Sequence, residues 1–379
     1  MKSQDKVRVA VLFGGRSAEH EISLQSAANV IQYLDKSRYE VVPIGISKQG
    51  HWFLGYELLK QHIDEKEKSK LLAEANTWFT PEWISKPVVQ HQPNEIIKRH
   101  GALFDVVFPA VHGSFCEDGT LQGLLELANL PYVGCGVLAS SIGMDKDISK
   151  RLASLAGVNV APYVAIKFGE WQQRAKNYLQ QIEEELTYPL FVKPANTGSS
   201  IGISKVKARD GLEAAITEAF RFDTKILIEQ GIHAAEIELA VLESLIPGKE
   251  PIVSIPGEIR SRHDFYSYDA KYLDENGAEL LIPAPISDKI AEQAKTIAKK
   301  IFAALECEGM ARVDLFLDKT NGELYFNEIN TIPGFTKISM YPKLLAASGI
   351  DYQALLTHLI ELAMNKYKFK SKIKRSYTD

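Results

Sequence analysis

The sequence predicts an α/β protein, of the α+β kind in its second half, from two segments that differ in pattern. Residues 6–47 carry strand, helix and strand patterns in turn, which is typical of a parallel β-α-β unit. Residues 311–334 predict an antiparallel β-hairpin, because two runs of alternating apolar and polar residues flank a Thr-Asn-Gly turn. With 379 residues, the chain is long enough for two or three domains.

The overall composition is ordinary for a soluble globular protein, with 45% apolar and 24% charged residues. A net charge of −4 gives no reason to expect nucleic acid as a partner. No apolar run approaches the roughly 18 residues that a membrane-spanning helix needs, so we expect no membrane partner. The three cysteines include no CxxC pair, which disfavours a zinc site or disulfide framework and favours the reducing cytoplasm.

Two polar segments follow strands of the N-terminal region, where open parallel sheets bind their ligands. The turn after the first strand contains Glu19, and a later strand ends at His112-Gly113 before the acidic turn 117–119. For Glu19 alone, an acid in the first helical turn that the helix dipole favours is an equal alternative. A single histidine at a strand end is usually structural, but the neighbouring glycine and acidic turn favour a site. Residues 51–100 are polar and irregular and predict a partly helical insertion without a catalytic role.

A phosphate site is predicted in the middle of the chain. A helix begins near residue 145 with Lys146 close to its N-terminus, and a strand with Lys193 leads into the loop NTGSSIG. Backbone amides and serine hydroxyls of such a loop are donors for phosphate oxygens, and the lysines add positive charge. The loop lacks the GK[ST] ending and following helix of a Walker A motif, and an ordinary flexible hairpin is the alternative.

The next two strands carry weaker indications of a nucleotide. The first ends at Glu229-Gln230-Gly231-Ile232, whose backbone suits a purine edge, and Glu236 in the second suits ribose hydroxyls. Without more context, these are edge-of-sheet residues with no assigned role. The aromatic-rich segment after them reads as a long loop, and loops of this length are usually functional or disordered. Its aromatic residues argue against disorder.

The register of the hairpin decides what its polar face can bind. We predict a three-residue loop, 320–322, with Gly322 in the left-handed conformation and Lys319 paired with Glu323. Counting back from this loop places Asp314 directly opposite Glu328, and the same count places Arg312 opposite Asn330.

Two opposed carboxylates repel each other unless a cation lies between them. Carboxylate and amide oxygens are the protein ligands of Mg²⁺, usually together with substrate phosphates. Asp314, Glu328 and Asn330 are therefore candidate magnesium ligands. Two carboxylates on the solvated face of an antiparallel sheet are an equally weighted alternative from the hairpin alone.

Six motifs occur together in this order: HGSFCEDGTLQG, MDK, VKPANTGSSIG, AKY, ARVDLFL and FNEINTIPGFTKIS. Together they resemble the D-alanine–D-alanine ligases of the ATP-grasp superfamily over nearly the full chain. The resemblance implies an ATP-grasp fold, in which a small central β-rich subdomain and a C-terminal antiparallel-sheet domain enclose ATP beside an N-terminal open parallel α/β domain. The implied parts are an N-terminal domain 1–134 with the insertion 51–100, a central subdomain 135–230, and a C-terminal subdomain 231–379 with a mobile loop at about 257–285.

The resemblance also implies roles for individual residues. Those implied for the two D-alanine sites are Glu19, His112, Lys271, Tyr272, Arg312, Ser339 and Met340. Those implied for catalysis are Glu19, Ser199, Tyr272, Arg312, Gly334 and Ser339, with Arg312 and the Gly334 amide at the tetrahedral oxyanion. Those implied for the nucleotide are Lys146, Lys193, Ser199, Ser200, Glu229, Ile232, Glu236, Lys271, Asn327 and Glu328. Asp314, Glu328 and Asn330 match the magnesium ligands.

The implied reaction consumes ATP and two D-alanine molecules and gives a dipeptide for peptidoglycan precursors. One carboxylate takes the γ-phosphate as an acyl phosphate, and the second amine attacks the activated carbonyl. The resemblance further implies two Mg²⁺ ions, for which Mn²⁺ substitutes, a monovalent cation as a candidate activator, and a homodimer.

Three residues depart from the family pattern: Cys116, Ala235 and Ser267. Cys116 replaces a usual glycine, so a positive φ there would cost about 1 kcal/mol or more. A ligase with D-lactate or D-serine as acceptor is the second hypothesis, and Tyr272 disfavours the depsipeptide-forming relatives. A nucleotide-binding protein without catalysis is the third, and Arg312 beside a metal site disfavours it.

Overall fold

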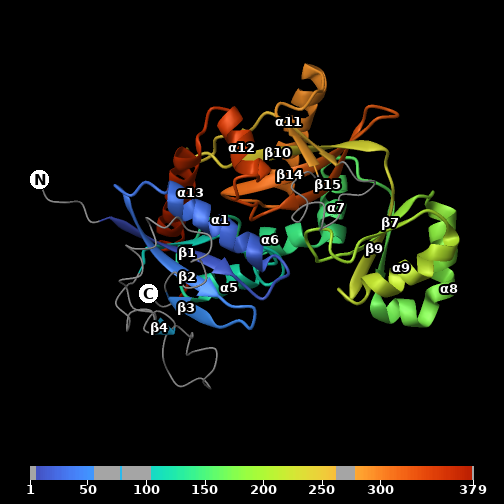
Figure 1. Cartoon of the computed structure of the whole chain (residues 1–379), viewed down its shortest axis with the longest axis horizontal. Coiled ribbons are helices and arrows are strands. Elements are labelled where there is room, and N and C mark those ends of the chain that lie inside the picture. The colour runs from blue at the N-terminus through green and yellow to red at the C-terminus, as the bar shows by residue number, and fades with distance from the viewer. Residues whose placement is uncertain (1–5, 55–76, 79–103, 262–277, 378–379) are drawn as a thin grey trace, which may run out of the picture.

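The computed structural model describes residues 6–54, 77–78, 104–261 and 278–377, which form three sheets (Figure 1). The first sheet lies toward one end of the molecule, the small second sheet lies at the other end, and the third lies between them. Most of the predicted insertion 51–100, together with Ser267, Lys271 and Tyr272, lies outside the described residues.

The first sheet contains the predicted β-α-β unit and confirms it. Its strand order is β4-β3-β2-β1-β5, in which β1 pairs in parallel with both β2 and β5. The elements are β1 (Val7–Gly14), α1 (His20–Tyr33), β2 (Tyr39–Ile46), β3 (Trp52–Leu54), β4 (Thr77–Trp78) and β5 (Val106–Pro109). Residues 9–13 are buried because helices cover both faces of the sheet, which explains their continuous apolar run.

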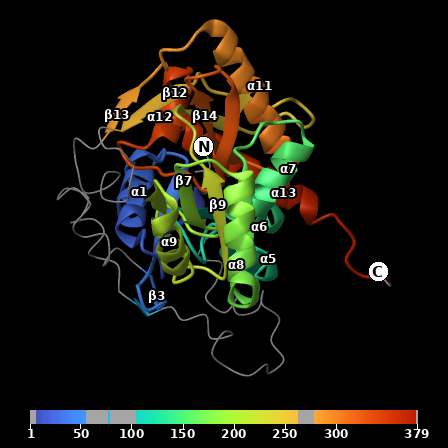
Figure 2. The same cartoon turned by 90° about the vertical axis from the view of Figure 1, so that its right-hand side faces the viewer.

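The second sheet is antiparallel, with the order β6-β9-β7-β8. Figure 2 shows helices α8 and α9 on its outer face. The elements are β6 (Tyr163–Lys167), α8 (Phe168–Glu185), β7 (Leu190–Pro194), β8 (Ser204–Val206), the 3₁₀ turn Arg209–Gly211, α9 (Leu212–Ala219) and β9 (Lys225–Gln230). Ile226 and Ile228 pack under these helices, so the alternation of the strand turns Glu229 toward the opposite, inner face.

The third sheet has the order β13-β12-β10-β14-β15, and β11 pairs with β10. Its strands are β10 (Ala234–Leu242), β11 (Ile252–Val253), β12 (Gly257–Ser261), β13 (Ala278–Leu281), β14 (Met310–Asp318) and β15 (Leu324–Asn330). Helices α7 (Lys146–Leu155) and α11 (Asp288–Ala304) cover one face. The expectation of a loop over 257–285 is wrong at its ends, because β12 and β13 form an antiparallel pair there.

The hairpin prediction is right about its facing residues and wrong about its loop. Asp314 lies opposite Glu328, and Arg312 lies opposite Asn330. However, the loop has four residues, 319–322, because the Asp318 amide donates to the Glu323 carbonyl at 2.9 Å. The register then shifts between Asp314 and Leu315, which makes Asn327 the extra residue of a β-bulge.

The remaining helices join the first and third sheets. They are α5 (Thr120–Leu127), α6 (Val137–Met144), α12 (Met340–Ala347) and α13 (Tyr352–Lys370). The C-terminal helix α13 packs beside α1 and β5, so one hydrophobic core includes residues of the N-terminal sheet and of the C-terminal helices (Figure 1). The three predicted boundaries stay predictions. No helix in the described ranges is long and apolar enough to cross a membrane.

Candidate active site

A cavity of about 540 Å³ lies between the inner face of the second sheet and the polar face of the third. It brings together ten residues that the sequence assigned to the nucleotide, the metal or the reacting carboxyl. They are Lys146, Lys193, Ser200, Glu229, Ile232, Glu236, Arg312, Asp314, Asn327 and Glu328. Residues from four of the six motifs therefore line one space.

The two predicted phosphate lysines enter the cavity from different elements. Lys146 is the first residue of α7, and its Nζ donates to the Thr197 carbonyl at 2.8 Å and lies 3.2 Å from the Glu328 carboxylate. Lys193 lies on β7, and its Nζ is 2.6 Å from the Glu229 carboxylate. Both side chains are largely buried, so their charges act where water screens them less.

Lys150 is a buried lysine that the sequence analysis missed. Its Nζ lies 2.7 Å from the Glu229 carboxylate and donates to the Phe326 carbonyl at 3.2 Å. Burial alone would raise the pKa of Glu229, but Lys150 and Lys193 outweigh it and lower that pKa to about 2. One helical turn separates Lys150 from Lys146, and this i, i+4 spacing is the signal that would have indicated it.

The predicted adenine segment bends between the second and third sheets. The side chain of Glu229 is held by two lysines, and the Gly231 amide donates to the Pro189 carbonyl at 2.8 Å. Ile232 and Glu236 line the cavity beyond this bend. Ala235, one of the three departures from the family pattern, is buried in the core on the opposite face of β10.

Three carboxylates form a row across the third sheet. Glu238 lies opposite Asp314 in the β10–β14 ladder, and Asp314 lies opposite Glu328 in the β14–β15 ladder. Glu238 is a further residue that the sequence analysis missed, although its spacing of two from Glu236 places both on one strand face.

Arg312 binds two carboxylates of this row. Its Nε and Nη2 each donate to Asp314 at 2.7 Å, and its Nε lies 3.1 Å from Glu238. Burial would lower the pKa of Arg312, but Asp314 and Glu238 outweigh it and raise that pKa, so the guanidinium stays charged. The Asn330 amide also donates to Asp314, at 3.0 Å.

The predicted magnesium ligands lie together, and their chemistry fits a hard cation. Two carboxylates and an amide oxygen face one another from β14 and β15. Their partners in this structure are Arg312 and Lys146. Within the described ranges, no group of three His, Cys, Asp or Glu side chains is gathered to hold a metal ion. Metal binding by these residues stays a prediction.

The first sheet contributes Glu19 to the rim of the site. The Ser199 hydroxyl donates to the Glu19 carboxylate, which links the glycine-rich loop to the N-terminal region. Ser199 and Ser200 both have positive φ values, 51° and 59°. Gly113 has a φ of 78°, and a Cβ there would lie 2.5 Å from Glu19 Oε2. This glycine is needed both for its backbone conformation and for the space that Glu19 occupies.

His112 is buried behind this rim. Its Nε2 lies 2.9 Å from the Ser26 hydroxyl, and its Nδ1 lies 3.2 Å from the Ile332 carbonyl and 3.3 Å from Glu117. Burial would lower the pKa of His112, but the hydrogen bond and charge of Glu117 outweigh it and raise that pKa. The positive φ near Cys116 belongs to Phe115, at 66°, so the cysteine itself is not strained.

The other residues implied for the oxyanion and the second D-alanine, Gly334, Ser339 and Met340, lie before and at the start of α12. The Ser339 hydroxyl accepts from the Thr336 amide at 2.9 Å, and a Cβ at Gly334 would lie 2.7 Å from that hydroxyl oxygen. The Met340 side chain is buried against Gly257, which leaves its backbone for any contact with a ligand.

Comparison with known proteins agrees with this geometry. Two family models match, the D-ala D-ala ligase N-terminus over residues 8–135 and the D-ala D-ala ligase C-terminus over residues 152–361. The chain belongs to the D-alanine–D-alanine ligase family. It is 50% identical to the D-alanine–D-alanine ligase of Caldicellulosiruptor bescii, over 98% of this chain and 99% of that one. It is 47% identical to D-alanine–D-alanine ligase A of Bradyrhizobium diazoefficiens, with the same coverage.

Solved structures of D-alanine–D-alanine ligases and their relatives share the fold. The D-alanine–D-alanine ligase of Coxiella burnetii has a TM-score of 0.76 and 35% identity, over 97% of each chain. The VanG D-Ala:D-Ser ligase of Enterococcus faecalis has the same TM-score and identity, over 95% of this chain and 100% of that one. The predicted ATP-grasp fold and ligase class are thereby confirmed.

Proposed function

We propose that the chain joins two D-alanine molecules into D-alanyl-D-alanine, with ATP as the energy source, for the synthesis of peptidoglycan precursors. The observation that carries this proposal is the single cavity in which two lysines, Arg312 and opposed carboxylates meet. Family membership supports the substrates, since the curated relatives are named for this reaction. The residue roles below extend that proposal.

The first step transfers the γ-phosphoryl group of ATP to a D-alanine carboxylate. An oxygen of the carboxylate forms a bond to the γ-phosphorus, the bond to the ADP oxygen breaks, and D-alanyl phosphate and ADP result. Lys146 and Lys193 bind phosphate oxygens, and Ser200 lies beside them in the glycine-rich loop. Positioning and charge neutralisation are the main requirements of this step, and both lysines supply them.

The second step forms the peptide bond. The amine of a second D-alanine attacks the acyl carbon and loses a proton, and phosphate leaves with one of the original carboxylate oxygens. Arg312 and the Gly334 amide stabilise the oxyanion of the tetrahedral intermediate. Asp314 and Glu238 hold the Arg312 guanidinium from two sides, so little reorganisation is needed when the oxyanion forms.

Bound magnesium supplies positive charge that offsets the charge developing on the transferring phosphoryl group. Asp314, Glu328 and Asn330 would hold it, because they are the opposed oxygen ligands of the cavity. The proposal also includes two Mg²⁺ ions, their replacement by Mn²⁺, and activation by a monovalent cation.

Glu19 binds the ammonium group of the first D-alanine. Its carboxylate lies against the glycine-rich loop through Ser199, so substrate and phosphate sites share a boundary. His112 supports this region from behind through Ser26 and Ile332. Lys271 and Tyr272, outside the described residues, are proposed to cover the bound substrates.

A D-serine acceptor is the second candidate, because a structural relative at 35% identity is a D-Ala:D-Ser ligase. The test is to incubate the purified protein with Mg-ATP and D-alanine, alone and with D-serine or D-lactate, and to measure phosphate and products. We expect phosphate and D-alanyl-D-alanine in equal amounts from D-alanine alone. No D-alanine-dependent phosphate release would contradict the proposal, and a mixed product in excess would favour the second candidate.

We also propose a cytoplasmic homodimer. The cysteines Cys116, Cys135 and Cys307 are free and buried, which suits a reducing compartment. Light scattering of the purified protein measures its mass directly and tests the dimer.

A further inference from the structure

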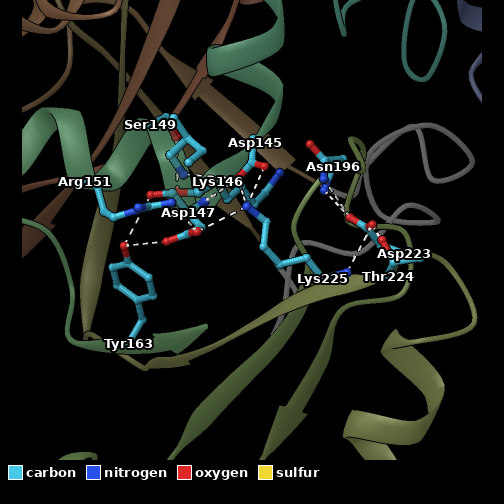
Figure 3. Close-up of polar contacts among 11 residues, drawn as sticks. Asp145, Lys146, Asp147, Ser149, Arg151, Tyr163, Asn196, Asp223, Thr224 and Lys225 are labelled. Carbon is cyan, nitrogen blue, oxygen red and sulfur yellow. Dashed lines mark hydrogen bonds and ion pairs between the residues drawn. The ribbon is translucent and has the colours of Figure 1, made fainter. Parts of the chain in front are cut away.

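Lys225 forms an ion pair with each of two aspartates on either side of Lys146. Its Nζ lies 2.6 Å from Asp145 and 3.2 Å from Asp147 (Figure 3). Asp145 is the N-cap of α7 and accepts from the amides of residues 147 and 148, both at 3.1 Å. A phosphate lysine thus begins a helix that has one acid at its N-cap and another in its first turn. The charge balance of these two acids depends on a lysine from another element.

Lys225 comes from the second sheet, whereas Lys146 and its helix pack against the third. Lys225 begins β9, and α7 packs on β15 and α11. Lys225 is not among the residues that line the cavity, so it acts on a ligand there through its neighbours. Its side chain is 15% exposed and those of its two partners are 16% and 11% exposed, so solvent screens these pairs only partly.

The same strand end also holds the glycine-rich loop. The carboxylate of Asp223 accepts from the Asn196 backbone amide at 2.7 Å and from its side chain at 3.0 Å. The Lys146 amide donates to the Ala195 carbonyl at 3.0 Å, and the Ala195 amide donates to the Lys225 carbonyl at 2.9 Å. Figure 3 shows Asp223 and Asn196 in contact beside Lys225 at the start of β9.

Other charged groups face the two aspartates as well. Arg151 donates to Asp147 at 2.9 Å, and the Tyr163 hydroxyl donates to the same carboxylate at 3.2 Å. Asp147 therefore keeps Arg151 as a cationic partner if Lys225 is lost. Asp145 differs, because within the described residues its only recorded ion pair is the one with Lys225. Loss of Lys225 would leave Asp145 with its two backbone hydrogen bonds but without this cationic partner, next to the phosphate lysine.

We propose that Lys225 is a positioning residue for the phosphate site: by neutralising Asp145 and Asp147, it keeps Lys146 available for the polyphosphate of the nucleotide. An uncompensated carboxylate beside Lys146 would repel phosphate oxygens and compete for the lysine ammonium group. The inference rests on the proposed function, because it requires that ATP binds in the cavity. It adds a residue that touches neither the nucleotide nor the reacting atoms.

The test compares the binding of Mg-ATP with that of adenosine, which lacks phosphates. The Lys225→Met variant removes the charge, and the double variant Lys225→Met with Asp145→Asn also removes the acid while keeping an N-cap residue. Lys225→Arg keeps the charge. Lys167→Met is the matched control, because Lys167 lies opposite Lys225 in the β6–β9 ladder and its side chain is exposed.

We expect Lys225→Met to raise the Kd for Mg-ATP about tenfold. The Kd for adenosine changes less than about twofold, and the double variant regains most of the Mg-ATP affinity. Lys225→Arg and Lys167→Met stay close to the wild type. Thermal unfolding of each variant shows whether it is folded at the assay temperature.

Equal loss of Mg-ATP and adenosine binding in Lys225→Met would overturn the inference, because it would indicate a general structural role. Failure of the Asp145→Asn change to restore Mg-ATP binding would overturn it as well. If the wild type itself bound adenosine but not Mg-ATP, the proposed function would fail and this inference with it. These outcomes are distinct because the wild type is measured in every series.

Discussion

Asp314 and Glu328 lie directly opposite each other across the β14–β15 ladder, although the outer part of the hairpin runs in a register shifted by one residue. The bulge at Asn327 brings the two carboxylates onto one face. Each carboxylate has a cationic partner, Arg312 for Asp314 and Lys146 for Glu328. Binding of Mg-ATP would have to open these two ion pairs. Single substitutions separate what each of the four residues contributes to turnover.

The first prediction concerns the proposed metal ligand Glu328. We expect Glu328→Gln to lower kcat by at least about a hundredfold, because it removes a charged oxygen ligand. Phosphate release with Mg-ATP and D-alanine measures the change, and circular dichroism checks the fold. Glu323→Gln, at an exposed position of the same hairpin, is the control and should be fully active. Near-normal turnover of Glu328→Gln would remove Glu328 from the metal site.

The second prediction concerns the guanidinium of Arg312. Lysine at this position keeps the charge but cannot bind Asp314 with two parallel hydrogen bonds. We expect Arg312→Lys to lower kcat by roughly 10²–10³. Arg221→Lys changes an exposed arginine in the turn after α9 and serves as control. An active Arg312→Lys enzyme would show that charge alone suffices at the oxyanion.

The third prediction uses two glycines with positive φ. A Cβ at Gly113 would lie 2.5 Å from Glu19 Oε2, whereas a Cβ at Gly157 would meet nothing within 4 Å. Alanine at either position costs about 1 kcal/mol of stability from the backbone. Gly113→Ala displaces Glu19 and the nearby Ser17 hydroxyl, whereas Gly157→Ala displaces neither. We therefore expect only Gly113→Ala to raise the KM for D-alanine, by about tenfold, with little change for ATP.

Steady-state kinetics of both glycine variants separates the clash from the backbone strain. Equal KM values for D-alanine in Gly113→Ala and Gly157→Ala would argue against Glu19 as the ammonium ligand.

The fourth prediction concerns pH and His112. Glu117 raises the pKa of His112 above the ordinary value of 6.5, so the folded protein binds this proton more tightly than the unfolded chain. The resulting stabilisation is complete below the unfolded value and is lost as the pH rises through the folded one. We expect the free energy of unfolding, relative to His112→Asn, to fall as the pH rises above about 6.5.

Urea denaturation of both proteins at several pH values measures this difference. A difference that stays constant as the pH rises, or grows with pH, would show that folding does not raise the pKa of His112.

The sequence predicts the elements and the facing pairs well because both depend on local pattern. Alternation of apolar and polar residues identifies β9, β10 and the hairpin, and helical spacing identifies α1. The hairpin loop was mistaken by one residue, and the bulge at Asn327 compensates for it. A bulge of this kind is set by how the strand meets the cavity and by tertiary packing, which no local pattern records.

The contacts between distant segments were beyond the sequence analysis. Lys150 and Glu238 are ordinary charged residues on an amphipathic helix and an alternating strand until the fold brings Glu229 and Arg312 against them. Lys225 likewise lies about eighty positions along the chain from Asp145. Ion pairs of this range follow from the packing of three sheets, so no local sequence pattern indicates them.

The transfer of oxygen from substrate to phosphate tests the central claim most directly. D-alanine labelled with ¹⁸O in its carboxylate is incubated with Mg-ATP and the wild-type protein, and the phosphate released is analysed by mass spectrometry. Activation as D-alanyl phosphate predicts one labelled oxygen in each phosphate formed together with dipeptide. Dipeptide formation with unlabelled phosphate would contradict the proposed route, because no carboxylate oxygen would then have bonded to phosphorus.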